Sequence, residues 1–286
     1  MAHSYQLGLY EKAMPGTLTF KEKLEAVKSA GFDFMELSVD ETDEKLARLD
    51  WNDSEIHDLR RLIEGTGVPV SSICLSAHRR FPLGDPDTAT RNRSLAIMEK
   101  AILLAVRLGV RIIQIAGYDV YYKESTDDTK KFFADSLARS VELAAASSVL
   151  LAFETMETPF INTVEKATRW VNEISSPYLA VYPDLGNITN AADGDSDRVS
   201  ADIQSGRGHI AAMHLKESKP GIFREVPYGE GHVDFARGVK TAWTLGVRMF
   251  TGEFWYTAET GDSWRELLAA NAKFLRGFCL HSQSLV

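Results

Sequence analysis

Short apolar runs alternate with longer amphipathic segments from one end of the chain to the other. The apolar runs are rich in β-branched and aromatic residues, and several show no polar alternation, which is typical of parallel strands covered on both faces. The pattern predicts eight strands, at Gln6–Tyr10, Phe34–Val39, Val70–Leu75, Ile112–Ala116, Val149–Phe153, Leu179–Pro183, Ile210–Leu215 and Met249–Glu253.

The amphipathic segments between these runs are predicted helices, and a glycine marks the end of several of them. Gly31, Gly67, Gly109 and Gly246 each follow such a segment, where a left-handed residue commonly closes the last turn. The predicted helices are Thr19–Ala30, Ser54–Thr66, Thr88–Leu108, Thr126–Ser147, Thr163–Ser175, Asp195–Gly206, Asp234–Leu245 and Ser263–Gly277.

Eight strand–helix units of about 36 residues favour a closed parallel barrel, because each unit is long enough for a crossover connection. A doubly wound sheet usually has fewer strands and a glycine-rich first turn, whereas the first predicted strand here is followed by Glu11-Lys-Ala-Met-Pro-Gly. No linker or block of like charge interrupts the pattern. We therefore predict an α/β fold, a (β/α)₈ TIM barrel forming one domain over residues 1–286.

Charge and composition exclude several classes of protein. The 32 Lys and Arg against 40 Asp and Glu give a net charge of −8, whereas a nucleic-acid binder needs a basic face. The two cysteines, Cys74 and Cys279, provide neither a disulfide framework nor a cysteine-based zinc site. No apolar run approaches the roughly 18–20 residues of a membrane span, and the N-terminus lacks the pattern of a signal peptide. We expect a cytoplasmic protein with no nucleic-acid or membrane partner.

Polar residues at the predicted strand ends indicate where the chemistry lies, because barrel enzymes react at the carboxyl ends of their strands. Four consecutive predicted strands end at or beside Glu154, Asp184, His214 and Glu253. Any one of them alone fits an ordinary rim residue. Together, three carboxylates and an imidazole suit one divalent ion such as Zn²⁺, Mn²⁺, Co²⁺ or Mg²⁺. Without a cation or shared protons, carboxylates held so close would repel one another.

The two glutamates of this group suggest a reaction. Glu154 and Glu253 belong to the fifth and eighth strands, so we expect them to approach a bound sugar from opposite sides. One would take a proton beside a carbonyl group and the other would return a proton on the opposite face, while the metal stabilises the enediolate. This predicts an epimerase. An aldose–ketose isomerase, which uses a similar site, is the alternative.

Two basic segments are weaker candidates for substrate binding. His78 and Arg79 follow the third strand and would hold an anion or close over the substrate, although a solvated basic loop fits equally well. The loop after the seventh strand carries Lys216, Arg224 and the turn at 229–231, in a place where barrels often bind phosphate. Glycines in that turn would expose backbone N–H groups to an anion, but Gly-Glu-Gly alone also fits a plain turn.

Several long segments resemble the L-ribulose-5-phosphate (L-xylulose-5-phosphate) 3-epimerases of L-ascorbate and L-xylulose catabolism, in the xylose-isomerase-like barrel superfamily. The resemblance spans nearly the whole chain, and AHRRFPLG and AGYDVYY are its most specific parts. The resembling segments are LGLYEKAMP at 7–15, GFDFMELSVDETDEKLARLDW at 31–51, CLSAHRRFPLGD at 74–85, IQIAGYDVYY at 113–122, YPDLGN at 182–187, HLKESKPGIFREVPYGEG at 214–231 and GEFW at 252–255.

The resemblance implies that one divalent metal is held by the four strand-end residues and that Glu154 and Glu253 are the acid/base pair. It implies interconversion of L-ribulose 5-phosphate and L-xylulose 5-phosphate at C3, with a small ketose phosphate as the binding partner, and leaves a homodimer open. Glu157 matches a substrate-contacting carboxylate of related ketose epimerases. Asn187 stands where enzymes for non-phosphorylated ketoses tend to carry histidine, which argues against a free ketose as substrate.

Two other classes use a related barrel or pocket. A metal-dependent abasic-site endonuclease needs a three-metal cluster with more histidines and a basic face, and the charge of −8 argues against it. A non-catalytic sugar-binding barrel would lose one member of the acid/base pair, yet both Glu154 and Glu253 are present.

Overall fold

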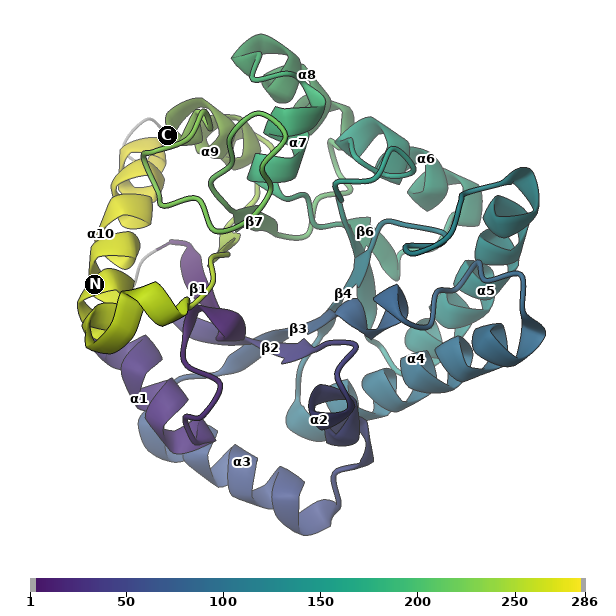
Figure 1. Ribbon diagram of the computed structural model, residues 1–286, viewed down its shortest axis with the longest axis horizontal. Helices are drawn as coiled ribbons and strands as arrows, with labels where there is room; N and C mark the ends of the chain where they lie inside the picture. Colours follow the sequence, from purple (N-terminus) through teal and green to yellow (C-terminus); the bar gives the residue numbers. More distant parts are fainter. Residues whose placement is uncertain (1–3, 284–286) are drawn as a thin grey trace.

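The computed structural model describes residues 4–283, and in them eight parallel strands form a curled sheet inside a ring of helices (Figure 1). The hydrogen-bonded order is β6-β5-β4-β3-β2-β1-β8-β7, and isolated parallel bridges at Val181–Ile210 and Asp184–His214 close the ring between β6 and β7. This confirms the predicted (β/α)₈ barrel. The strands are β1 Gln6–Tyr10, β2 Phe34–Val39, β3 Val70–Leu75, β4 Ile112–Ala116, β5 Leu150–Glu154, β6 Leu179–Val181, β7 Met213–Leu215 and β8 Met249–Gly252.

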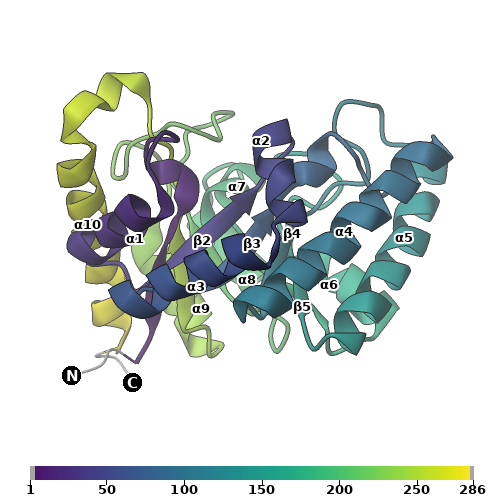
Figure 2. The ribbon, with the colours of Figure 1, turned by 90° about the horizontal axis from the view of Figure 1, so that it is seen from below.

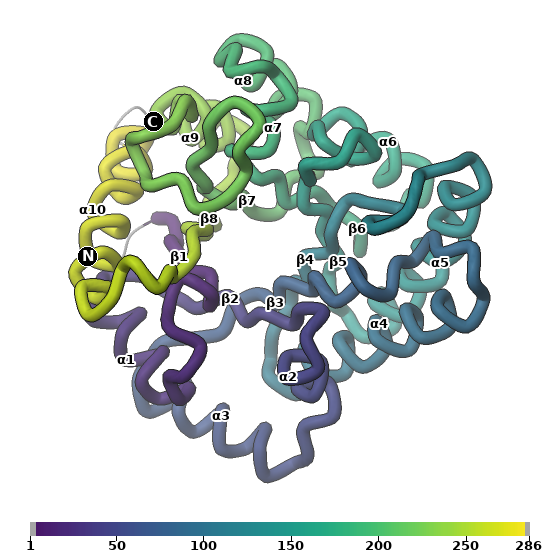
Figure 3. The backbone as a smooth tube through the Cα atoms, viewed as in Figure 1, coloured from purple at the N-terminus to yellow at the C-terminus, as the bar shows by residue number. Residues whose placement is uncertain are grey.

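The helices lie outside the strands, as the side view shows for α1, α3, α4 and α5 (Figure 2), and the chain passes once around the ring (Figure 3). Between residues 4 and 283, no helix is long and apolar enough to cross a membrane.

The α-helices are α1 Phe20–Ala30, α2 Asp43–Leu46, α3 Asp53–Thr66, α4 Thr88–Leu108, α5 Asp127–Ala146, α6 Val164–Ile174, α7 Leu185–Ala191, α8 Ser196–Ser205, α9 Phe235–Thr244 and α10 Trp264–Gln283. The 3₁₀ turns are η1 Glu11–Ala13, η2 Ala47–Asp50, η3 Ser76–Arg79 and η4 Ala258–Ser263. Residues 1–3, which belong to the segment used for the signal-peptide expectation, lie outside the described residues.

Local sequence signals set the ends of the helices. Thr19 and Asn52 form capping boxes at the starts of α1 and α3, each satisfying backbone N–H groups that the first turn leaves free. Gly31, Gly67 and Gly109 end α1, α3 and α4 with φ of 88°, 72° and 75°, a left-handed conformation in which other residues are strained. These caps fix where each helix turns back toward the next strand.

Alternation along the strands separates a large outer core from a narrow barrel interior. Met35, Leu37 and Val39 of β2 pack in the apolar core between the sheet and the helices. The residues between them in β2 point the other way, into the barrel. The interior is so narrow that a Cβ on Gly8 would lie 2.1 Å from the ring of Phe34. The interior therefore combines a few large rings, such as those of Phe34 and Tyr182, with small and polar residues, and the candidate site is built from the polar ones.

The structure differs from the predicted elements around β6 and β7, which are both shorter than expected. Pro183 has no N–H to continue the ladder, so β6 ends at Val181. Ile210 makes only an isolated bridge, and β7 begins at Met213. The helices α2 and α7 were not predicted either, because four and seven residues are too short to show an amphipathic period.

Candidate active site

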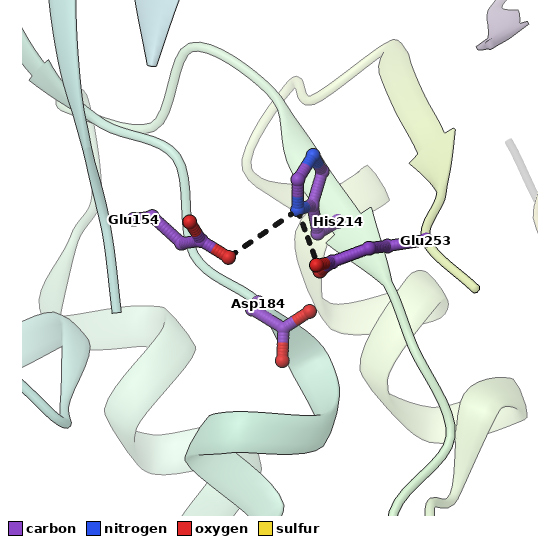
Figure 4. A group of neighbouring side chains, drawn as sticks. All are labelled: Glu154, Asp184, His214 and Glu253. Carbon is purple, nitrogen blue, oxygen red and sulfur yellow. Dashed lines mark hydrogen bonds and ion pairs between the residues drawn. The ribbon is translucent and has the colours of Figure 1, made fainter. Parts of the chain in front are cut away.

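Four side chains from neighbouring strand ends converge inside the barrel (Figure 4). Glu154 is the last residue of β5, Asp184 precedes α7, His214 lies in β7, and Glu253 follows β8. One nitrogen or oxygen atom from each lies within 4.8 Å of those of the others, and all four residues are buried. The reason is topological, since parallel strands of a barrel all deliver their carboxyl ends to the same rim.

The imidazole of His214 presents one nitrogen to the group. Its Nδ1 lies 2.9 Å from Oε2 of Glu253 and 3.5 Å from Oε1 of Glu154, the two contacts drawn in Figure 4. On the other side of the group, Nζ of Lys216 lies 3.1 Å from Oδ1 of Asp184 and 3.7 Å from Oε2 of Glu253. The group therefore combines three carboxylates, one imidazole and one ammonium.

One atom of this group supports the fit of a cation. Oδ1 of Asp184 accepts a hydrogen bond of 2.6 Å from the backbone N–H of Asn187, the cap of α7. Oδ2 of the same carboxylate is buried without a hydrogen-bond partner. Buried polar atoms are rarely left unsatisfied in this way. This oxygen is free to coordinate a cation. Together with two more carboxylates and an imidazole, it forms the donor set expected for a divalent metal.

Burial and mutual repulsion shift the ionisation of the three carboxylates. Burial raises the pKa of Glu154, and the nearby charge of Glu253 raises it further. Burial also raises the pKa of Asp184 to about 8, although Lys216 favours its charged form. Burial opposes ionisation of Glu253 too, but Lys216 and His214 outweigh it and hold the pKa of Glu253 well below its usual range. The group thus favours additional positive charge, which a divalent ion supplies.

The two basic members of the group respond in the opposite direction. Burial alone would lower the pKa of His214, yet the carboxylates of Glu36 and Glu253 outweigh it and raise the pKa well above its usual value. In the same way Asp184 and Glu253 outweigh the effect of burial on Lys216, and its pKa is raised. Lys216 therefore carries its full charge at neutral pH.

A narrow cavity of about 50 Å³ opens from the group toward solvent. Side chains from six of the strand ends and from the loop after β7 line it, and they are mostly polar or aromatic. They are Tyr10, Lys12, Cys74, Ser76, Arg79, Glu154, Met156, Glu157, Asn187, Lys216, Phe223, Arg224, Glu253 and Trp255. A larger hollow of about 550 Å³ lies around Ser175 and His209, away from these residues. The smaller cavity is the candidate active site, because the ionisable groups converge there.

The structure brings most of the predicted substrate residues to this cavity. Glu157, Asn187, Lys216, Arg224 and Arg79 all line it. Asn187 accepts a hydrogen bond of 2.8 Å from Nζ of Lys216 and donates one of 2.7 Å to the carbonyl oxygen of Thr155. Arg79 lies over the ring of Tyr121, with its guanidinium carbon 4.7 Å from the ring centroid.

His78 lies elsewhere, although it is the neighbour of Arg79. Its ring is buried, and Nε2 lies 3.2 Å from the backbone carbonyl oxygen of Ser94 in α4. The two residues share the 3₁₀ turn η3, whose tight winding sends successive side chains in different directions. Arg79 therefore points to the cavity, whereas His78 points to the helix layer.

The turn at 229–231, for which the sequence left both an anion site and a plain turn open, packs on a carboxylate of the chain itself. The carboxylate of Glu217 is buried beneath it and accepts hydrogen bonds from the N–H groups of Gly229, at 3.0 Å, and Val233, at 3.2 Å. A Cβ on Gly231 would lie 2.2 Å from Oε1 of Glu217. Close packing on this carboxylate thus explains Gly231, whereas Gly229 adopts a left-handed φ of 82° in the turn.

Several residues of the site were not predicted from the sequence, and three of them are charged or aromatic residues with clear positions. Lys12 and Trp255 line the cavity, and Glu36 of β2 contacts His214 from behind, with Oε1 2.6 Å from Nε2. Glu36 is fully buried within an otherwise mostly apolar strand. A charged residue in such a strand is itself a signal, because burying an unpaired charge is costly.

Comparison with known proteins places the barrel in a family. The sequence profile described as xylose isomerase-like TIM barrel matches residues 24–277, so the chain belongs to that family. Within it, the L-ribulose-5-phosphate 3-epimerase UlaE of Escherichia coli O157:H7 is 49% identical over 235 residues, which cover 82% of this chain and 81% of that protein. The epimerase of the same name from Shigella boydii serotype 18 shows the same identity and coverage. The chain is thus an epimerase of the isomerase class, in agreement with the family resemblance noted in its sequence.

Solved structures confirm the fold. The D-psicose 3-epimerase of Clostridium cellulolyticum H10 superimposes with a TM-score of 0.78 at 17% identity, covering 96% of this chain and 99% of that one. A structure of L-ribulose 3-epimerase gives a TM-score of 0.74 at 20% identity, covering 98% of this chain and 95% of that one. At such low identity these matches bear on the barrel alone.

Proposed function

We propose that this protein interconverts L-ribulose 5-phosphate and L-xylulose 5-phosphate by removing and returning the proton on C3. The observation that carries the proposal is the placement of Glu154 and Glu253, two carboxylates from separate strands that both line the cavity and belong to the same buried group. The 49% identity to L-ribulose-5-phosphate 3-epimerases supports the choice of substrate.

We further propose that one divalent ion, Zn²⁺, Mn²⁺, Co²⁺ or Mg²⁺, is held by Glu154, Asp184, His214 and Glu253. The unpartnered Oδ2 of Asp184 and the oxygen-rich donor set support this assignment. Once bound, such an ion would polarise the substrate carbonyl and stabilise the negative charge that develops on it. Fixing that charge in a buried site is worth more than in water, because the surroundings do not have to reorganise.

The chain's own residues carry the proton transfer. The C3 proton of the substrate is acidic because it lies next to the C2 carbonyl, and one glutamate of the pair removes it to give an enediolate. The other glutamate returns a proton to the opposite face of C3, which inverts that carbon. A positioned general acid or base typically contributes about 10²–10⁴-fold to the rate. The burial of both carboxylates favours this chemistry, since water that would compete for the protons is largely excluded.

Lys216 and Asn187 are suited to hold the reacting end of the sugar. Nζ of Lys216 lies within the carboxylate group and contacts Asn187, rather than reaching the rim where a phosphate would sit. We therefore assign these two residues to the hydroxyl groups near C2 and C3, and Glu157 to a hydroxyl group nearer the cavity mouth.

The phosphate end is assigned to the cationic residues at the mouth. Arg79 and Arg224 line the cavity, and their side chains are partly exposed, at 16% and 42%. Arginine binds phosphate oxygens through paired N–H groups, which favours a phosphorylated substrate. Lys12 also lines the cavity, but its Nζ pairs with Asp40 at 2.5 Å, so we assign the phosphate to the two arginines.

A solvent isotope experiment tests the reaction. The purified protein, loaded with Mn²⁺, is incubated with L-ribulose 5-phosphate in D₂O and the products are resolved by NMR. We expect L-xylulose 5-phosphate carrying deuterium at C3 and none at C1. Deuterium at C1 with formation of an aldose phosphate would show an aldose–ketose isomerase instead. Conversion without any exchange at C3 would exclude the proton-transfer mechanism.

A further inference from the structure

Glu36 is a buried carboxylate near the site that takes no part in the reaction proposed above. It lies in the middle of β2, is fully buried and does not line the cavity. Both of its oxygens have partners. Oε1 lies 2.6 Å from Nε2 of His214, and Oε2 accepts a hydrogen bond of 2.6 Å from Oγ of Ser72 in β3. A chain of contacts thus runs from β3 through β2 to β7, across the barrel interior.

These contacts determine which nitrogen of His214 faces Glu154 and Glu253. With Ser72 donating to one oxygen and His214 to the other, Glu36 acts only as an acceptor, so Nε2 of the ring carries a hydrogen. The amide nitrogen of Gln114 lies 3.2 and 3.1 Å from Nδ1 and Nε2, and therefore favours neither. Nδ1 is the nitrogen turned toward Glu154 and Glu253, as Figure 4 shows. A cation at this site would take the place of the hydrogen on Nδ1 and bind the lone pair of that nitrogen.

A carboxylate in the barrel interior has a substantial cost, because ions buried away from water lose their hydration. Ser72 and His214 compensate for it through two short hydrogen bonds. A residue that only filled space in β2 would not need a charge, since Phe34, Met35 and Leu37 of the same strand are apolar and fully buried. The position of the charge, directly behind a proposed metal ligand, points to a role in orienting that ligand.

We propose that Glu36 is a positioning residue: it holds the ring of His214 with Nδ1 toward the cation site, and so sets the affinity for the metal, while Ser72 holds Glu36 in place. This inference rests on the metal site proposed above. Carboxylate partners of metal-binding histidines fix the tautomer and orientation of the ring, and their loss typically costs about 10–100-fold in metal affinity.

The test measures metal affinity directly, by titrating the metal-free protein with Co²⁺ against a chromogenic chelator and recording the visible Co²⁺ spectrum. We expect Glu36→Leu to weaken Co²⁺ binding about 10–100-fold and to change the spectrum, because the imidazole is no longer held. Glu36→Gln keeps an acceptor for Nε2 but loses the charge, so an intermediate weakening is expected. Ser72→Ala leaves the contact to His214 intact and should weaken binding least, by a few-fold.

Asp202→Asn is the matched control, because Asp202 also accepts two hydrogen bonds, from the N–H groups of Val164 and Glu165, but lies outside the barrel interior. It should lower the unfolding midpoint while leaving the Co²⁺ affinity unchanged. If Glu36 had only a structural role, its variants would likewise lower the unfolding midpoint and leave the Co²⁺ affinity unchanged. Folded Glu36→Gln and Ser72→Ala variants with the affinity and spectrum of the unaltered protein would therefore overturn the inference, even if Glu36→Leu fails to fold.

A double-variant cycle separates this inference from the metal site on which it rests. In a His214→Ala background, Glu36→Gln should cause no further loss of Co²⁺ affinity, because its effect passes through the imidazole. Fully additive losses would overturn the positioning role and leave the metal site standing. If the unaltered protein binds no Co²⁺ at the site, the proposed function itself fails, and this inference fails with it.

Discussion

The guanidinium of Arg224 lies 3.5 Å from Oε1 of Glu157, so that the loop after β7 and the loop after β5 meet above the cavity. Tyr121 donates a hydrogen bond of 2.7 Å to the same oxygen of Glu157. The cavity beneath has about 50 Å³, whereas ligand pockets commonly measure about 300–1,000 Å³. We therefore expect the proposed sugar phosphate to displace this contact when it enters, which would free Arg224 to bind the phosphate.

Replacing Arg224 should accordingly impair the phosphorylated substrate selectively. We expect Arg224→Ala to lower kcat/KM for L-ribulose 5-phosphate about 10–100-fold, mainly through KM, because a charge-assisted hydrogen bond contributes about 1.5–3 kcal/mol. Arg80→Ala is the matched control, since Arg80 pairs with Asp43 and does not line the cavity. An equal loss for L-ribulose 5-phosphate and for dephosphorylated L-ribulose would contradict a phosphate contact.

The proposed ligands can be tested one at a time. Asp184→Asn keeps the cap of α7, because asparagine also accepts from the backbone, but it removes a charged ligand. His214→Ala removes the nitrogen ligand. Both variants should hold far less than one metal ion per chain by elemental analysis and should lose turnover, since an incomplete shell binds metal weakly. Full metal content together with full activity in both variants would exclude the site.

The burial of His78 predicts a pH dependence of stability. Burial lowers the pKa of His78 to about 4, whereas a histidine in an unfolded chain titrates near about 6.5. Between these values the unfolded state binds more protons, so His78 lowers the stability progressively as the pH falls from about 6.5 to about 4. At pH 5 the loss should amount to about 2 kcal/mol.

The variant His78→Gln separates this effect from a role in substrate binding. Its amide nitrogen can still donate to the carbonyl oxygen of Ser94, but it does not titrate. In urea unfolding at pH 7 and pH 5, it should lose about 2 kcal/mol less than the unaltered protein. Its KM at neutral pH should be unchanged. An equal loss of stability in both proteins would contradict the buried neutral ring, and a large rise in KM would show contact with the substrate.

Glu11 is predicted to be the most consequential carboxylate for stability. Directly after β1, it is buried among Lys23, Lys45 and Arg48, whose nitrogens lie 2.7, 3.1 and 2.5 Å from its oxygens. Glu11→Gln leaves three cations without their common anion, which should cost about 3–5 kcal/mol in urea unfolding. Glu25→Gln, which breaks an exposed pair with Lys21 at 3.9 Å, should cost less than about 1 kcal/mol.

Acid should reproduce part of the Glu11 effect. Although burial opposes it, the hydrogen-bonded Arg48 and the charges around Glu11 lower its pKa well below its usual value. The stabilisation is therefore complete above the pKa of an unfolded glutamate, about 4.3, and is lost as the pH falls further. The stability of Glu11→Gln should fall less steeply below pH 4 than that of the unaltered protein. Parallel pH profiles would contradict this assignment.

The sequence predicted the strands well where their apolar runs end at clear turn signals. The bounds of β1 to β4 agree with the expected ones. The α7 helix was not predicted because Leu-Gly-Asn-Ile-Thr-Asn-Ala has no amphipathic period, and its start depends on the cap that Asp184 provides. Such a cap is recognisable only once the end of β6 is known.

In the site, the features that could be predicted depend on topology, whereas those that could not depend on the direction of single side chains. Residues at the ends of parallel strands must share a rim, so the four ionisable residues could be grouped from their positions alone. Whether His78 or Arg79 points to the cavity depends on the winding of one 3₁₀ turn. The contact between Glu36 and His214 depends on barrel closure, which brings a mid-strand residue of β2 against β7.

The barrel closes between β6 and β7, beside the candidate site, and the backbone pairing is weakest there. Among residues 4–283, β6 and β7 are joined by isolated bridges rather than by a ladder, and one of these pairs Asp184 with His214. An ion held by both residues would cross-link the two strands where their backbones bond least. Metal binding would then also join β6 to β7. The expected sign is slower amide hydrogen exchange at 179–184 and 210–215 when metal is added. The bound metal ion would thus make the β6–β7 side of the barrel more rigid even without substrate.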